Sequence, residues 1–576
     1  MTSLRGQTTA YGRFLLLIAG IGGLLYGIDI GIISAALLYL NRTISLTEQQ
    51  TSFIVAAVLG GSMGSSLIAG VLADRFGRKR MMITSGLMFV ASVGSIVLSQ
   101  SFVPLFLGRL LQGMSGGVIA VVVPLYLAEC LGANSRGRGT AIFQFMLTLG
   151  IVVAALAGLH YTQHAEAAIA AAAGDAALIG KAQNEAWRGM FLSVIYPGFL
   201  FFLGACFLSE SPRWLFRRGY KEEALAALRR SCSEEEAELE IREMEMATAA
   251  GRQKERGAAS GSLLQRKYVA PFILACIILG CNQATGINSI LQFLVVILKQ
   301  AGMSASLATR GDVAVKALNC VMTLVAVTLV DRKGRKYLLK LGTGGIIVAL
   351  VSSALIFRGF ESKRIDIRDK LRGAITNDSL ILPLSQAHLS TTETGRPMCL
   401  TVLYSYGEGD KVATVLSNDR NPFLSIVPER NGKNLQRLVI KRAQYGPVPT
   451  ELTGWLITGF LSLFIASFSL GPGVCVWLAL TELMPTRIRS TGMGIALLIN
   501  QGVSTAIAAA FLPTVGNYGY STMFFFWAGC TVVYFVTAAF FLPETKGRTL
   551  EEIEEYFETG KVKTAAVALA GDAPES

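Results

Sequence analysis

The stretch GVLADRFGRKR, residues 70–80, decides the fold of this chain. It separates two apolar runs, 53–72 and 81–98, each long enough to cross a lipid bilayer. A short basic turn with glycine between two such runs is typical of a cytoplasmic loop that joins membrane helices. The chain restates this motif 257 residues later, where DRKGRK at 331–336 follows the pattern of DRFGRK at 74–79.

Further landmarks repeat in the same order. An acid followed seven positions later by arginine occurs twice, and so does a short turn around a glutamate: Glu129 with Arg136, Glu482 with Arg489, Ser209-Glu210-Ser211 and Pro543-Glu544-Thr545. From the aspartate of the basic loop to the first of these acids is 55 residues in the first half and 151 in the second. The difference of 96 residues lies almost entirely in the polar segment 358–450. Two similar halves with one insertion indicate a duplicated transporter fold.

The composition predicts a membrane protein. Hydrophobic residues make up 52% of the 576 residues, charged residues only 16%, and the mean hydropathy is +0.50. We predict an all-α protein with twelve transmembrane helices in two six-helix pseudo-repeats, at about 14–40, 51–73, 81–99, 102–131, 138–161, 188–208, 268–298, 308–330, 337–357, 452–481, 490–514 and 520–542. The expected units are a bundle at 1–209, a cytoplasmic helical linker at 210–267, a bundle at 268–357 and 451–545, an extracytoplasmic insertion at 358–450 and a cytoplasmic tail at 546–576.

The net charge of +13 follows the membrane topology and does not indicate nucleic-acid binding. With both termini inside, the short cytoplasmic loops carry thirteen Lys or Arg and the short outer loops about five. This is the positive-inside bias that fixes the orientation of a membrane protein. We therefore expect a multi-pass protein of a plasma membrane or bacterial inner membrane, in contact with lipid, with both termini cytoplasmic.

The sequence offers no chemistry typical of an enzyme. Of nine cysteines only Cys399 lies outside the predicted spans and the cytoplasmic side, so neither a disulfide framework nor a metal-ligand spacing is available. The insertion contains His388 but no recognisable nucleophile motif, and segments such as 400–406 and 412–416 favour a small β-containing element there. We expect no enzyme activity, metal or cofactor, a proton gradient as the energy source, and a monomeric functional unit.

Two charges stand alone in their spans. Asp29 is the only charge between 14 and 40, and Arg109 the only one between 102 and 128. An ionisable residue inside a span is unfavourable and indicates function by default. Burial favours the protonated form of a carboxyl group, whereas a neighbouring guanidinium favours its charged form. Making or breaking this pair would therefore unload or load a proton. The alternative is a static ion pair that holds two helices together.

The clearest sign of a ligand site is NQATGIN, residues 282–288, in the seventh span. Several amides at mid-membrane are unfavourable unless they line a polar cavity. Gln283 and Asn288 point in different directions unless the helix breaks, and Gly286 favours such a break. Amides offer donors and acceptors without charge, which suits a neutral ligand rich in hydroxyl groups.

Other polar residues could join this site. Gln144 lies on an apolar stretch, although a single glutamine is more often a contact between helices. Asn319 shares a helix face with Lys316, which we expect to extend toward the outer surface. Trp477 follows the helix-interrupting GPG at 471–473 and could cover the apolar face of a sugar ring, or simply pack.

Taken in order, eleven motifs resemble the sugar porter family of the major facilitator superfamily. The resemblance covers essentially the whole chain apart from 162–187 and 358–450. The motifs are GIDIGIIS (27–34), GVLADRFGRKR (70–80), GRLLQG (108–113), PLYLAE (124–129), RGRGTAIFQ (136–144), SESPRWL (209–215), NQATGIN (282–288), DRKGRK (331–336), GPGVCVW (471–477), TELMPTRIRSTG (481–492) and PETKGRTLEEI (543–553).

The resemblance implies a rocker of two six-helix halves with the sugar at their interface. It implies sugar contacts at Gln144, Gln283, Asn288, Asn319, Trp477 and Asn500, with Asn282 beside them where many members have glutamine. It matches Asp29 to the acid of the proton symporters, where facilitative members have a neutral residue, and Arg109 to its partner. It implies a cytoplasmic gate that stabilises the outward-open state, formed by charges among Asp74, Arg75, Arg78, Glu129, Arg136, Glu210, Arg213, Asp331, Arg332, Glu482, Arg489 and Glu544.

Three functions follow, in order of preference. The first is proton-coupled import of a monosaccharide, a hexose or a pentose, by alternating access. The second is facilitated diffusion of a sugar or of an inositol-like polyol. The third is a sugar sensor without turnover. Departures at Asn282, Gln292 and Gln501, and the long insertion, leave the identity of the sugar open, because hydrogen-bond geometry sets discrimination among hydroxylated ligands.

Overall fold

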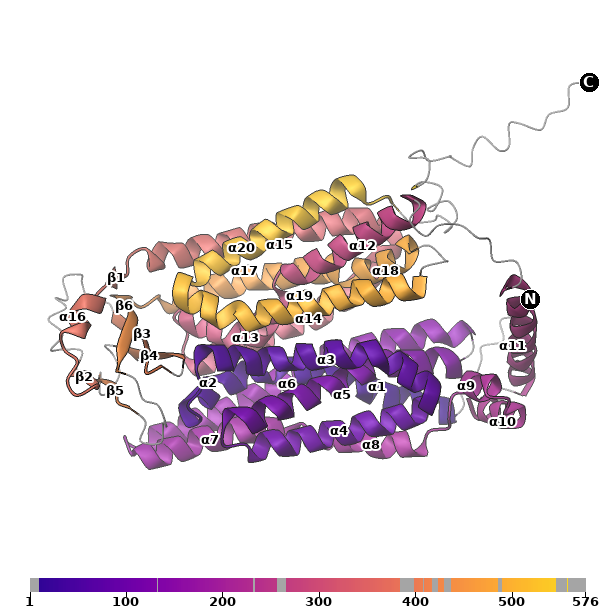
Figure 1. The fold of residues 1–576 in the computed structure, drawn as a ribbon, viewed down its shortest axis with the longest axis horizontal. Coiled ribbons are helices and arrows are strands. Elements are labelled where there is room, and N and C mark those ends of the chain that lie inside the picture. Colours follow the sequence, from indigo (N-terminus) through magenta and orange to yellow (C-terminus); the bar gives the residue numbers. More distant parts are fainter. Residues whose placement is uncertain are drawn as a thin grey trace, which may run out of the picture.

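The structure, a computed structural model, forms two helical bundles side by side (Figure 1). It describes residues 10–131, 133–231, 234–255, 266–383, 398–407, 409–416, 423–428, 437–484, 489–544 and 557. The first bundle contains α1 (Ala10–Gly31), α2 (Ile33–Thr43), α3 (Glu48–Phe76), α4 (Arg78–Leu98), α5 (Phe102–Cys130), α6 (Ala133–Ala171), α7 (Ala176–Ser193) and α8 (Ile195–Phe207). The second contains α12 (Arg266–Ala284), α13 (Ile287–Gln300), α14 (Ala305–Lys333), α15 (Arg335–Glu361), α17 (Glu451–Leu470), α18 (Pro472–Leu483), α19 (Arg489–Tyr518), α20 (Tyr520–Val536) and the π-helical turn η1 (Thr537–Phe541).

The predicted all-α membrane fold is confirmed. Within the described residues, eleven helices, some of them with a break, are long and apolar enough to cross a membrane. The one expected span that is not among these eleven, the eighth at 308–330, is α14, which packs along α6 of the first bundle and α17 of its own. Its first turns carry Arg310, Asp312 and Lys316, and these charges make it less apolar than the others.

Four spans are interrupted among the described residues, and the sixth breaks at Val194, between α7 and α8. The first span breaks at Ile32, between α1 and α2. The seventh breaks at Gly286, where φ is +84° and an added Cβ would overlap the indole ring of Trp527. The tenth breaks at Gly471, before Pro472 begins α18. The breaks predicted in the seventh and tenth spans are therefore present.

Three helices that lie between the bundles in sequence are placed at one end of the molecule, which we call the linker end. They are α9 (Pro212–Arg217), α10 (Lys221–Ser231) and α11 (Glu234–Glu255) (Figure 1). They enclose a small apolar cluster that includes Leu215, Leu228 and Ile241. The amphipathic helices expected in this linker are present, and α11 continues eight residues beyond the predicted end at about 247.

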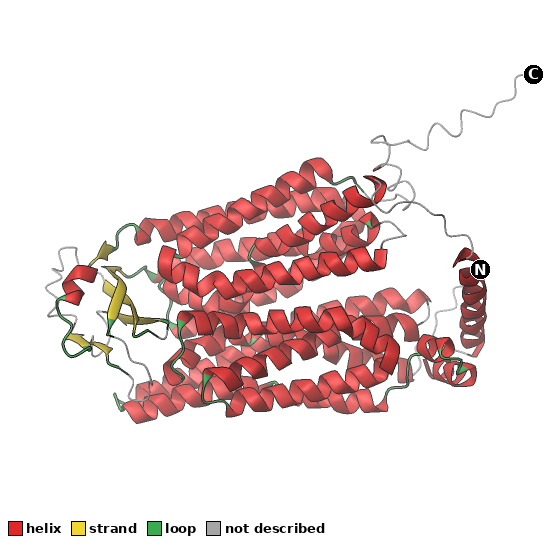
Figure 2. Ribbon diagram, in the orientation of Figure 1, coloured by secondary structure: helices red, strands yellow, loops and turns green. Residues whose placement is uncertain are grey.

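The insertion contains the β-strands of the described part of the chain and lies at the opposite end, the insertion end (Figure 2). Its elements are β1 (Ile365–Asp366), α16 (Arg368–Arg372), β2 (Leu380–Pro383), β3 (Met398–Ser405), β4 (Asp410–Leu416), β5 (Phe423–Ile426) and β6 (Val439–Pro447). An antiparallel sheet of order β1-β6-β3-β4 and a β2-β5 pair share a core of their own, which includes Leu400, Ile440 and Leu424. The predicted β-containing element is confirmed; His388 lies outside the described residues.

The two bundles are closed against each other at the insertion end. Helix α2 packs on α13, α3 on α19, and α6 on α14. Ala56 and Leu59 of α3 form an apolar cluster with Ala508 of α19, and the amide of Leu512 donates to Ser52 Oγ at 3.1 Å. These contacts lie in the first half of α3, the half that begins beside strand β4 of the insertion.

Candidate functional site

The two lone charges of the first bundle form a buried ion pair. Arg109 Nη1 lies 3.3 Å from Asp29 Oδ1, and both side chains are 0% exposed. Arg109 also donates to Gln112 Oε1 at 2.6 Å, and its guanidinium carbon lies 5.5 Å from the centroid of the Phe191 ring. The pairing that the sequence predicted between α1 and α5 is therefore present.

This pair is incompletely satisfied. Among the described residues, no group donates to Asp29 Oδ2, and Arg109 Nε and Nη2 have no acceptor. Gly116 leaves the space beside the carboxylate, because a Cβ at that position would lie 3.3 Å from Asp29 Oδ2. A buried carboxylate with one free oxygen can accept a proton without breaking its existing contact to the arginine.

Three amides meet at the break between α12 and α13. Asn288 Nδ2 donates to Gln283 Oε1 at 3.0 Å, and Gln283 Nε2 donates to Asn500 Oδ1 of α19 at 3.3 Å. Asn288 Nδ2 also donates to Ser504 Oγ at 2.8 Å. The left-handed conformation of Gly286 turns the chain so that Gln283 and Asn288, five positions apart, can face each other. The result is a neutral polar surface inside the second bundle.

The remaining predicted sugar contacts lie outside this amide cluster or outside the described residues. Asn319 is buried on α14 and accepts from Ser469 Oγ of α17 at 2.8 Å. Asn282 is buried next to the amide cluster, and no described residue donates to its Oδ1. The side chain of Gln144 is exposed on α6. The side chain of Trp477 is outside the described residues.

The prediction that Lys316 extends toward the outer surface is wrong. Its side chain is 0% exposed, and its Nζ lies 2.8 Å from Asp312 Oδ2, one turn earlier on α14. The buried carboxylate retains the ammonium inside the protein, where an unpaired charge would be strongly disfavoured. The signal was present in the sequence, because Asp312 and Lys316 stand at the i, i+4 spacing of a helical ion pair. Ser504 could likewise have been found one turn after Asn500.

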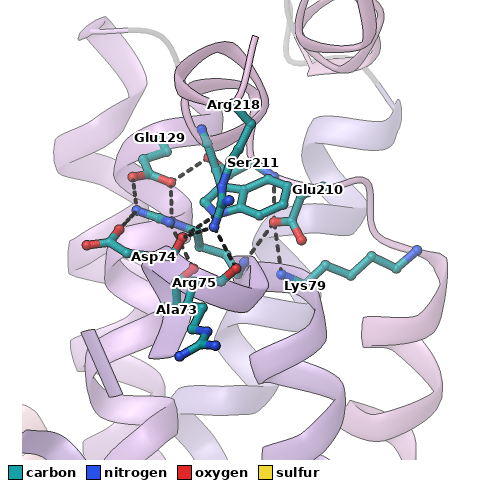
Figure 3. A network of polar contacts seen from close by, with 10 residues as sticks. Ala73, Asp74, Arg75, Lys79, Glu129, Glu210, Ser211 and Arg218 are labelled. Carbon is teal, nitrogen blue, oxygen red and sulfur yellow. Dashed lines mark hydrogen bonds and ion pairs between the residues drawn. The ribbon is translucent and has the colours of Figure 1, made fainter. Parts of the chain in front are cut away.

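Charged residues of the first bundle gather at the linker end (Figure 3). Arg78 is buried and pairs with Asp74 at 2.7 Å and with Glu129 at 2.8 Å. Ser211 Oγ donates to Glu129 Oε2 at 2.5 Å. Arg78 is therefore the centre of this cluster, and it holds the basic loop against the end of α5 and the start of α9.

Glu210 and Glu544 have equivalent roles in the two bundles. Glu210 accepts from the backbone amides of Arg78 at 2.8 Å and Lys79 at 3.1 Å, at the first turn of α4. Glu544 accepts from the amides of Arg335 at 3.1 Å and Lys336 at 3.2 Å, at the first turn of α15. A carboxylate is favoured there because the first turn of a helix presents unpaired N–H groups and a positive dipole. The internal repeat read from the sequence thus has a structural counterpart.

Two other predicted gate residues, Arg75 and Arg213, make different contacts from those of Arg78. Arg75 is exposed, and its guanidinium carbon lies 5.6 Å from the centroid of the Phe76 ring, so Arg78 and not Arg75 makes the described ion pairs. Arg213 pairs with Glu240 of α11 at 3.7 Å, within the linker. The side chains of Arg136, Asp331, Arg332, Glu482 and Arg489 lie outside the described residues.

The described residues include no cluster of histidine, cysteine, aspartate and glutamate that could hold a metal ion. The features brought together by the fold are therefore a buried ion pair in one bundle, a neutral amide cluster in the other, and a charge cluster at the linker end. None of these features places a nucleophile next to a general base. Their chemistry suits the binding of a neutral polar ligand and the binding and release of a proton.

Known proteins resemble this chain over nearly its full length. The family model for "Sugar (and other) transporter" matches residues 15–374 and 442–557. The glucose transporter GlcP of Staphylococcus epidermidis is 26% identical over 550 residues, covering 94% of this chain and 96% of the relative. The human proton myo-inositol cotransporter is 27% identical over 568 residues, covering 96% and 83%. Among solved structures, a partially occluded inward open conformation of the xylose transporter XylE from E. coli aligns with a TM-score of 0.64 at 19% identity, covering 93% of this chain and 100% of that one.

Proposed function

The chain belongs to the family of sugar (and other) transporters, and from this premise we propose that it imports a monosaccharide, a hexose or a pentose, together with protons. Asp29 is the proton carrier in this proposal, and Arg109 is the residue that modulates it. The energy comes from a proton gradient, and no cofactor takes part. The observation that carries the proposal is the buried, incompletely satisfied pair of Asp29 and Arg109.

The amide cluster supports a neutral, hydroxylated substrate. Gln283, Asn288 and Asn500 present donors and acceptors without a net charge, and these can exchange their mutual hydrogen bonds for bonds to sugar hydroxyls. A charged substrate would need a counter-charge at the site, because a buried unpaired ion is strongly unfavourable. Gln144, Asn282, Asn319 and Trp477 complete the proposed contacts.

Alternating access explains why the contacts between the bundles gather at one end. In this state the insertion end is closed by α2 with α13 and α3 with α19. Transport requires these contacts to part while the linker end closes, with the charge clusters around Arg78, Glu129, Glu210 and Glu544 forming the gate there. Binding at a site between two rigid repeats that tilt in turn is the general mode of such carriers.

The charge distribution supports the orientation of this proposal. The basic loops after α3 and α14 lie at the linker end, so that end is cytoplasmic and the insertion is extracytoplasmic. Both termini are then cytoplasmic, in a plasma membrane or bacterial inner membrane. The functional unit is a monomer, because each chain supplies both repeats.

Uptake into proteoliposomes tests the proposal. The purified protein should accumulate a labelled hexose or pentose above equilibrium when a pH gradient is imposed, and should exchange sugar without one. The variant Asp29→Asn should lose gradient-driven accumulation and keep counterflow. If Asp29→Asn accumulates sugar as the unmodified protein does, the assignment of the proton carrier is wrong.

A second candidate is facilitated transport of a sugar or an inositol-like polyol. The observation that favours it is the Asp29–Arg109 contact itself, since an ion pair that never opens would only hold α1 against α5. In that case counterflow of a sugar or of myo-inositol would occur with no effect of a pH gradient. Binding without any counterflow would instead support a sensor.

A further inference from the structure

A second buried ion pair lies outside the proposed sugar and proton sites. Asp312 and Lys316 are one turn apart on α14, and their side chains are 1% and 0% exposed. Burial of two charges is unfavourable unless each ion finds hydrogen bonds beyond its partner. The source of those additional bonds therefore indicates what the pair does.

Both additional bonds come from the other bundle. Ser34 Oγ of α2 donates to Asp312 Oδ1 at 3.1 Å, and Lys316 Nζ donates to the carbonyl of Gly31 at 3.1 Å. Ser34 Oγ also accepts from the amide of Val295 on α13 at 3.3 Å. The pair thus bridges the boundary between the two halves, at the point where the first span is broken.

The break in the first span makes this contact favourable. Helix α1 ends at Gly31, and the carbonyls at the end of a helix lack partners within it and carry the negative end of the helix dipole. An ammonium group at that end satisfies a carbonyl and complements the dipole. Because Gly31 follows Asp29 by two residues, Lys316 holds the helical turn that carries the proposed proton site.

We propose that Asp312 and Lys316 act as a latch between the bundles, which holds the insertion end closed and sets the balance between the two states of the transporter. The inference rests on alternating access in the proposed function. When α14 moves away from α1 and α2, the bonds to Ser34 and Gly31 must break. The bond between Asp312 and Lys316 survives, because both residues belong to one helix.

A native cysteine reports the opening of this boundary. Cys320 lies one turn after Lys316, is 8% exposed, and accepts from Thr148 Oγ1 of the first bundle at 3.5 Å. In right-side-out vesicles without sugar, a membrane-impermeant thiol reagent is added from the outside, and modification of Cys320 is followed by mass spectrometry. Because no substrate is present, the result does not depend on which sugar is transported or on proton coupling.

Two variants decide the proposal. Ser34→Ala removes both bonds of Ser34 Oγ to the second bundle, the one to Asp312 and the one from the amide of Val295. It should raise the rate of Cys320 modification by at least about fivefold, the scale of one lost hydrogen bond. The exchange Asp312→Lys with Lys316→Asp keeps an ion pair within α14 but removes the donor to Gly31, so it should also raise the rate. The control Ser92→Ala removes a buried hydroxyl that bonds only within α4, to the carbonyl of Phe89, and should leave the rate unchanged.

The same experiment can overturn the latch. If Ser34→Ala and the exchanged pair both modify Cys320 at the rate of the unmodified protein, the contacts do not set the balance of states. If Ser34→Ala raises the rate but the exchanged pair does not, the pair is a structural bridge within α14 and the assignment to Lys316 is wrong. Melting temperatures of all variants are compared with that of the unmodified protein. A general loss of stability would lower the melting temperature and would raise the rate of Cys320 modification in Ser92→Ala as well.

Discussion

At the scale of single residues, neutral amides provide the polar groups at the break between α12 and α13. Asn288 is central there, because its Nδ2 contacts both Gln283 and Ser504. A side chain that bonds two partners in this way can exchange them for a ligand with little rearrangement. In the proposed function, Asn288 therefore orients the other polar groups and offers its own to the substrate.

We expect Asn288→Ala to weaken sugar binding about tenfold, or ~1.4 kcal/mol, the scale of one lost buried hydrogen-bond partner. Proton-driven accumulation of sugar should persist at saturating substrate, because Asp29 is untouched. Substrate dissociation constants from isothermal titration provide the measurement. Thr343→Ala is the matched control, since that buried hydroxyl donates to the carbonyl of Leu339 within its own helix. Equal affinities for the two variants would remove Asn288 from the site.

Gly286 is the residue on which the shape of this site depends. Its φ of +84° is unfavourable for a residue with a side chain by ~1–2 kcal/mol, and an added methyl group would meet the indole of Trp527. We expect Gly286→Ala to lower the melting temperature in detergent and to abolish sugar binding. Gly459→Ala is the control, because no atom lies within 4 Å of the added Cβ on α17. A melting temperature of Gly286→Ala at or above that of the control would contradict this account.

At the scale of elements, the sequence predicted the positions of the spans, the break at Gly286 and the β-structure of the insertion. These features depend on local pattern: apolar length, a glycine among amides, and alternating apolar residues between turns. The burial of Lys316 was not predicted, because the depth of a side chain depends on which helices of the other bundle cover it. The same holds for Arg75 and Arg78, two arginines three positions apart that only tertiary packing distinguishes.

The contact between the insertion and the second bundle was also not predictable from local sequence patterns. Arg442 on β6 donates through Nη1 to the carbonyls of Gly516 at 3.0 Å and Asn517 at 2.8 Å, at the end of α19. A cation is favoured there because the last carbonyls of a helix lack partners and carry partial negative charge. The insertion is therefore attached to the second bundle at its two chain connections and at a third point, the end of α19.

We expect Arg442→Ala to release the insertion from α19 without unfolding it. Hydrogen exchange of the last turn of α19 should accelerate about tenfold, the scale of a charge-assisted hydrogen bond on a half-exposed residue. Exchange in β3 and β4 should be unchanged, because their core does not involve Arg442. Lys441→Ala serves as control, since its ammonium pairs with Asp410 within the insertion at 2.6 Å. Acceleration confined to β3 and β4 would show that Arg442 acts on the sheet instead.

At the scale of the whole molecule, the sequence predicted two like halves but not the state in which they meet. A repeat motif such as DRFGRK defines an equivalent loop in each half and has no information on which end of the interface is closed. The structure is closed at the insertion end, through contacts such as Ser52 with Leu512 and Ala56 with Ala508. These contacts join residues far apart in sequence and, in the proposed cycle of alternating access, belong to one of its two states.

The closed interface between α3 and α19 allows this motion to be stopped. A Cβ added at Gly60 would lie 3.4 Å from Thr505 Cγ2, an approach compatible with the spacing of a disulfide. We expect Gly60→Cys with Thr505→Cys to form a cross-link on mild oxidation and to lose transport by more than tenfold, with recovery on reduction. The loss follows because the insertion end must open to load substrate, and a covalent bond between the halves prevents it.

Each single cysteine variant, treated with the same oxidant, should transport at its initial rate. Sugar binding from the linker side should survive in the cross-linked protein, which separates a block of the motion from damage to the site. Full transport by a protein shown by mass spectrometry to be cross-linked would mean that α3 and α19 stay together throughout the cycle.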